Sequence, residues 1–228
     1  MSELIGNGSE ERWYPIPIHK IKNHLTKYEI DEKLCPDSKF IIANISYNIQ
    51  YVQYLRKTLN ELNLPSVIEI QTIKSFIVIS TSIIEAIFYL ICCNENLRKK
   101  VIWKEFKTIG KSEFKLDRKS LKSETKLFEK NAESDSEFES MTFDQMIKKI
   151  ETKKVLKQEN QFFKDLNHLR KLRNKIHLQE TKTIGKTDYN SFWKPEYNLS
   201  KKNLRLLLLD EMFMKDEWNV ELFEFLKI

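Results

Sequence analysis

Four residues close together in the chain have side chains suited to phosphate chemistry. They are Arg170, Arg173, Asn174 and His177. Arginine binds two phosphate oxygens at once through its planar guanidinium, and histidine exchanges protons near neutral pH. Asparagine can orient either side chain or hydrogen-bond a ribose hydroxyl. Because RNA supplies its own nucleophile, the 2′-hydroxyl, these groups are sufficient for cleavage of RNA without a metal ion.

A helix from about Gln161 to Leu178 must position these side chains. On a helical wheel at about 100° per residue, the core-facing stripe contains Phe162, Leu166, Leu169, Leu172 and Ile176. The solvated face opposite it carries Lys164, His168, Lys171 and Lys175. The four polar residues stack along the border of the core stripe, and Arg173 lies almost against it. A structural alternative is that Arg173 and His177 bridge neighbouring helices, with His177 capping the last carbonyls.

Other segments predict a helical bundle around this helix. Only 4 Gly and 5 Pro occur, which favours long helices over a sandwich or barrel. Further helices are expected over about 37–63, 66–97, 143–152, 198 or 200 to 212, and 217–226, and Thr142 is expected to cap the one that begins at 143. In the first of these, the residues at helical spacing are Phe40, Ala43, Tyr47, Tyr51, Tyr54 and Leu55. The predicted fold class is all-α, with four to five core helices.

The helix expected over 66–97 is apolar on most sides, which is typical of the centre of a bundle. Its middle contains Glu85, a carboxylate that is expensive in lipid, so a buried core helix is favoured over a membrane span. A carboxylate in such surroundings must be paired or protonated. Glu85 either orients Arg173 or His177 across the core, or forms a structural hydrogen bond to an adjacent helix.

Two segments stand apart from the predicted bundle. Residues 1–36 form an arm in which the Trp13-Tyr14-Pro15-Ile16-Pro17 run is extended. Residues 98–140 form a charged insertion into the domain that spans 37–228. From Arg98 to Lys130 this insertion holds 12 basic and 5 acidic residues. The segments on either side of Gly110 are compatible with a small β-hairpin, and the lysines could follow an RNA backbone or simply be solvated.

Composition limits the cellular setting. The formal net charge of +6 makes an acidic partner such as RNA plausible. Three cysteines, two of them adjacent, make a poor disulfide framework and fit a reducing cytoplasm. No second Cys/His pair has ligand spacing, so neither a metal nor a cofactor is expected. The N-terminus lacks the apolar region of a secretory signal.

Three segments resemble the HEPN superfamily, in particular its bacterial RiboL-PSP and Abi-like type. Residues 169–178 (LRKLRNKIHL) resemble the family's signature, an arginine, usually a polar residue and then a histidine on the last core helix. Residues 82–90 (SIIEAIFYL) are similar to its second helix, where Ser-x-x-Glu is common, and residues 141–147 (MTFDQMI) resemble its third. The resemblance covers roughly residues 37–212 without the insertion.

The resemblance implies a homodimer in which paired Arg/His motifs form a metal-independent endoribonuclease site that leaves a 2′,3′-cyclic phosphate. It implies Arg173, Asn174 and His177 as catalytic residues, with Arg170 and Glu85 in support. The family pattern places four to six residues between the arginine and the histidine. Six residues separate Arg170 from His177, which is the permitted spacing. Only three separate Arg173 from His177, but Arg173 is followed by a polar residue, Asn174, as in the family, and is therefore favoured. Many members are toxins or anti-phage effectors, which makes an antitoxin or defence partner plausible.

Two other functions remain open at this stage. The first is a catalytically inactive HEPN module that binds RNA, a nucleotide or a partner protein. The second is a structural partner in a larger complex, for which the aromatic stretch from Trp218 to Phe225 would suit an interface.

Overall fold

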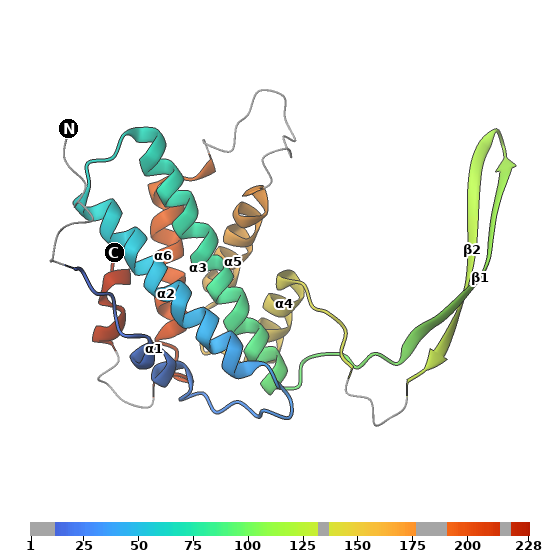
Figure 1. The fold of residues 1–228 in the computed structure, drawn as a ribbon, viewed down its shortest axis with the longest axis horizontal. Helices are drawn as coiled ribbons and strands as arrows, with labels where there is room; N and C mark the ends of the chain where they lie inside the picture. The colour runs from blue at the N-terminus through green and yellow to red at the C-terminus, as the bar shows by residue number, and fades with distance from the viewer. Residues whose placement is uncertain (1–11, 132–136, 177–190, 215–219) are drawn as a thin grey trace. The chain divides into compact units, whose positions relative to one another are not determined.

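A computed structural model of the chain describes residues 12–131, 137–176, 191–214 and 220–228. The chain divides into two compact units, Met1–Asn96 with Thr142–Ile228, and Leu97–Met141. The first unit is helical and the second contains a two-stranded β-ribbon (Figure 1). The predicted all-α class is therefore wrong, because the fold combines a dominant helical unit with an antiparallel sheet.

The helical unit is built around one long apolar helix. Its elements are α1 (Ile18–Leu25), α2 (Ser38–Glu61), α3 (Ser66–Asn94), α4 (Phe143–Lys153), α5 (Asn160–Arg173), α6 (Lys194–Leu208) and the 3₁₀ helices η1 (Asn174–Ile176) and η4 (Glu221–Leu226). Helix α3 packs against α2, α4, α5 and α6. Its side chains Ile77, Ile84, Phe88 and Ile91 have at most 1% of their surface exposed, as expected for a core helix.

Helix α3 is also long and apolar enough to cross a membrane by length and composition alone. The mean hydropathy of its most apolar stretch is 2.2, and 67% of that stretch is buried inside the structure. Such values are shared by the central helix of a soluble bundle and by a membrane span.

Helix α2 faces the core with a different stripe from the one its aromatic spacing suggests. The buried side chains are Ile42, Ile45, Ile49, Val52 and Leu55. The aromatic residues of the predicted stripe are exposed, namely Phe40 (73%), Tyr47 (51%), Tyr51 (45%) and Tyr54 (50%). The helix carries two apolar stripes. The aliphatic one packs against α3 because it buries no polar atom, whereas each tyrosine keeps its hydroxyl in water.

Three other helix boundaries differ from prediction. The arm contains helix α1, which packs against α2. Helix α6 begins at Lys194 rather than at 198 or 200, because Pro195 fits the first helical turn, where a missing N–H costs nothing. Helix α5 ends at Arg173, and the chain continues as the 3₁₀ turn η1 instead of as α-helix.

The second unit is a long β-ribbon. Strands β1 (Trp103–Leu116) and β2 (Lys119–Lys130) pair antiparallel, and Asp117 and Arg118 form the turn with φ values of 47° and 63°. Two successive positive φ values are typical of a tight hairpin turn that matches strand twist. Gly110 lies within β1 opposite Thr125 rather than at the turn that was predicted there. Aromatic and β-branched residues, among them Trp103, Thr108 and Phe114, favour strands in this segment.

Candidate functional site

The end of helix α5 brings an arginine from the signature segment to a carboxylate of the central helix. Nη1 of Arg173 lies 2.5 Å from Oε2 of Glu85 in α3. The side chains of the two residues are 28% and 26% exposed, so the ion pair lies at the rim of the bundle. This contact links the last turn of α5 to the middle of α3. Glu85 is thus paired, as its apolar surroundings require.

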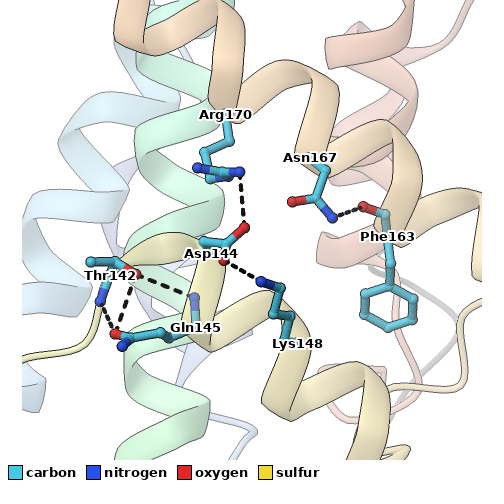
Figure 2. A network of polar contacts seen from close by, with 7 residues as sticks. All are labelled: Thr142, Asp144, Gln145, Lys148, Phe163, Asn167 and Arg170. Atoms are coloured by element: carbon cyan, nitrogen blue, oxygen red, sulfur yellow. Dashed lines mark hydrogen bonds and ion pairs between the residues drawn. The ribbon is translucent and has the colours of Figure 1, made fainter.

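The second arginine of the segment binds a different helix. Nη2 of Arg170 lies 2.8 Å from Oδ1 of Asp144 in α4, and Nζ of Lys148 lies 2.7 Å from Oδ2 of the same carboxylate (Figure 2). The hydrogen bond from Lys148 holds the pKa of Asp144 below its ordinary value, and the charge of Arg170 acts in the same direction. The two arginines are therefore oriented by two separate carboxylates.

Helix α4 holds Asp144 in place through its N-terminal cap. The hydroxyl of Thr142 accepts a hydrogen bond from the backbone N–H of Gln145, and the Gln145 side chain accepts one from the backbone N–H of Thr142 (Figure 2). This reciprocal arrangement is a capping box. The predicted cap at Thr142 is confirmed, and it fixes the first turn of α4, from which Asp144 points toward α5.

The helical wheel correctly predicted the core-facing and solvated faces of α5 and the position of its two arginines. The core stripe is buried at Phe162, Leu166, Leu169 and Leu172. The predicted solvated face is exposed at Lys164, His168, Lys171 and Lys175. Arg170 and Arg173 lie between these faces and are half-buried, as their position at the border predicts.

The two other predicted catalytic residues, Asn174 and His177, follow the end of helix α5 in the sequence. Asn174 lies in η1 and is exposed to solvent. His177 lies outside the described residues. Sequence reasoning gave no role to Asp144 or Lys148, although Asp144 sits within the segment that resembles the family's third helix. The sequence does place Asp144 in the first turn of a predicted helix and four residues before Lys148, a spacing that favours an ion pair.

The charges around the two arginines do not cancel. Three cations, Arg170, Arg173 and Lys148, share two carboxylates, Asp144 and Glu85, which leaves a formal charge of +1. Among the described residues, the buried Nε atom of Arg170 has no hydrogen-bond partner. A guanidinium has five N–H donors, so each arginine keeps donors beyond those that its carboxylate uses. The cluster can therefore accept a further anion.

A separate cavity lies elsewhere in the helical unit. It has a volume of about 570 Å³ and is lined by residues of α1, α2 and η4, including Lys20, His24, Gln53 and Phe225. The described residues of the signature segment, 169–176, do not border it. Across the described ranges, no three His, Cys, Asp or Glu side chains gather in a way that could hold a metal ion.

Comparisons with known proteins complete the description of the site. No family model, no curated protein and no solved structure matches this chain.

Proposed function

We propose that the chain is a metal-independent endoribonuclease of the HEPN type, which acts as a homodimer. The observation that carries this proposal is the ion pair between Arg173 and Glu85. It holds a phosphate-binding group at the end of α5, immediately before Asn174 and four residues before His177. A guanidinium that is already oriented binds a phosphate at a lower entropic cost.

The proposed reaction needs only proton transfer and charge stabilisation. The 2′-hydroxyl oxygen of RNA attacks the adjacent phosphorus, and the bond from phosphorus to the 5′-oxygen breaks. The attacking hydroxyl loses its proton to a base, and the departing 5′-oxygen gains one. His177 is suited to these transfers, and Arg173 stabilises the charge that develops on the phosphoryl oxygens. The products are a 2′,3′-cyclic phosphate and a 5′-hydroxyl.

Two copies of the chain supply the acid and the base. One helix offers a single Arg/His set, and a two-fold axis would place a second set on the other side of the phosphate. From the family resemblance, we place the activity in the cytoplasm, as a toxin held by an antitoxin or as an effector of anti-phage defence.

A binding module without catalysis is the second candidate, and one observation favours it. Each arginine already binds a carboxylate, Asp144 or Glu85, and such pairs also occur as purely structural links between helices. A binding module would retain RNA affinity with a steep salt dependence and would produce no cleaved RNA.

A cleavage assay in the presence of a chelator tests the endoribonuclease. Arg173→Ala should lower the rate of cleavage of single-stranded RNA by about 100-fold or more. Lys171→Ala, two residues away on the solvated face, is the matched control and should cut like the wild type. Circular dichroism checks that both variants are folded. Equal rates for Arg173→Ala and wild type would refute the role of Arg173, and RNA binding without product would favour the binding module.

A further inference from the structure

The β-ribbon accounts for four of the six units of the chain's net positive charge. Residues 103–130 contain nine lysine or arginine residues and five acidic ones, a net charge of +4, whereas the whole chain has +6. Every side chain of the two strands is exposed except that of Thr108, which is half-buried. The charge is therefore available to a partner in solution.

Many of these lysines are not neutralised within the ribbon. Two ion pairs join the strands, from Lys126 to Glu105 at 2.8 Å and from Lys111 to Glu124 at 3.8 Å. The ribbon lysines that form no ion pair with another described residue are Lys107, Lys115, Lys119, Lys122 and Lys130. The positive charge of these five lysines is therefore not neutralised by the described residues of the ribbon.

Aromatic rings are exposed between these lysines. The exposed fractions are 59% for Trp103, 65% for Phe106, 48% for Phe114 and 53% for Phe128. Cross-strand pairing puts Phe114 opposite Leu121 and Phe128 opposite Glu105, so the two rings lie on opposite faces of the ribbon. Both faces of the ribbon therefore present an exposed ring on which a base can stack.

An isolated two-stranded hairpin is only marginally stable in water. The strands are about 40 Å long at ~3.4 Å per residue, and within the described residues no third strand pairs with them. A bound partner would stabilise the ribbon. The excess positive charge favours an acidic partner, and lysines interleaved with exposed aromatic rings are typical of surfaces that bind single-stranded nucleic acid.

We propose that the β-ribbon binds single-stranded RNA. The five lysines that form no ion pair among the described residues contact phosphates, and the exposed rings, among them Phe106 and Phe114, stack on unpaired bases. The assignment to RNA rather than DNA rests on the proposed function, whereas the charge and the rings alone indicate single-stranded nucleic acid of either kind.

Binding to an uncleavable RNA tests this proposal without reference to catalysis. The probe is a short, fluorescent single-stranded RNA with 2′-O-methyl groups, which lacks the nucleophilic hydroxyl, and fluorescence anisotropy measures its affinity for the full chain. The ribbon variant combines Lys107→Gln, Lys115→Gln, Lys122→Gln and Lys130→Gln. Its affinity should fall by about tenfold or more, and the slope of log affinity against log salt should become shallower by about 3.

A matched control removes the same charge from the helical unit. It combines Lys33→Gln, Lys153→Gln, Lys154→Gln and Lys164→Gln, which are exposed residues. This control should bind RNA within about twofold of the wild type. A second ribbon variant, Phe106→Leu with Phe114→Leu, keeps apolar side chains but removes the π-faces, and it should lose several-fold in affinity.

Three outcomes would overturn the proposal. The first is a wild-type protein that does not bind the probe, and the second is a ribbon variant that binds as well as the control. In either case, a shift from dimer to monomer in Leu121→Glu would identify a second copy of the chain as the ribbon's partner. The third is tighter binding of a matched single-stranded DNA than of the RNA probe, which would overturn the assignment to RNA. Ribbon-dependent RNA binding by a protein that cuts no RNA would instead refute the proposed function alone.

Discussion

The guanidinium of Arg173 and the carboxylate of Glu85 form an ion pair between the end of α5 and the middle of α3, with 2.5 Å between Nη1 and Oε2. The two residues are 88 positions apart in the sequence. The pair is a link between two core helices and also the element that orients the proposed phosphate-binding group. Stability and catalysis can therefore be separated by choosing substitutions that affect them differently.

A double-mutant cycle should reveal this link as a coupling energy. Glu85→Gln and Arg173→Gln each remove one charge from a half-buried pair and leave the other without its partner. We expect each single variant to lower the free energy of unfolding by about 1–2 kcal/mol, and the double variant to lose about 1 kcal/mol less than their sum. Denaturant unfolding measures all four proteins. Strict additivity would show that the ion pair contributes nothing to stability.

The cap of α4 should contribute independently of the ion pairs. Thr142→Ala removes the hydroxyl that accepts a hydrogen bond from the backbone N–H of Gln145. The free energy of unfolding should fall by about 1 kcal/mol. Thr152→Ala, an exposed threonine in the last turn of α4, is the control and should change it by less than about 0.5 kcal/mol. Equal effects of the two substitutions would argue against the capping box.

Stability should fall in mild acid because of one buried histidine. His24 is 1% exposed, and its Nε2–H donates to the carbonyl oxygen of Leu208 at 2.7 Å. Burial lowers its pKa from 6.5 to about 4. The unfolded chain therefore binds a proton at a higher pH than the folded protein does, and stability is lost as the pH falls from about 6.5 toward 4.

The size of this effect can be measured against a variant without the imidazole. From pH 7.5 to pH 5, we expect His24 to account for a loss of about 2 kcal/mol in the free energy of unfolding. Other groups also titrate between these pH values, so the His24→Leu variant serves as the reference. Between pH 7.5 and pH 5, its free energy of unfolding should fall by about 2 kcal/mol less than that of the wild type. If the free energy of unfolding changed equally with pH in both proteins, His24 would not be neutral and buried as the structure shows.

The two stripes of α2 should respond differently to truncation. Ile49 is fully buried, and Ile49→Ala should lower the free energy of unfolding by about 2–4 kcal/mol. Tyr51 is 45% exposed, and Tyr51→Ala should change it by about 0.5 kcal/mol or less. Thermal or denaturant unfolding checks both. If Tyr51→Ala lowered the free energy of unfolding more than Ile49→Ala does, the aromatic stripe of α2 would have to be buried in a contact of its own.

Sequence-based prediction worked best for helices that have a single apolar stripe. The core stripe of α5 and the cap at Thr142 follow from local spacing, which also determines their structure. In α2 two apolar stripes compete, and only packing against α3 decides between them. Local patterns cannot resolve such a choice, because both stripes satisfy the helical period.

Long-range features were harder to predict. The pairing of Glu85 with Arg173 was one of two interpretations, and no local signal identifies the partner of a half-buried carboxylate on another helix. The binding of Arg170 to Asp144 was missed, since it depends on how α4 and α5 pack. The hairpin was expected to turn at Gly110, whereas two left-handed residues, Asp117 and Arg118, form the turn and require no glycine.

Product analysis after incubation with a chelator tests the central claim most directly. The wild-type chain should convert single-stranded RNA to fragments that end in a 2′,3′-cyclic phosphate. His177→Ala should abolish this product, whereas His168→Ala, which removes an exposed histidine from α5, should release it at the wild-type rate. Unchanged product formation by a folded His177→Ala protein, or no cleavage by the wild type, would contradict the claim that this segment cuts RNA.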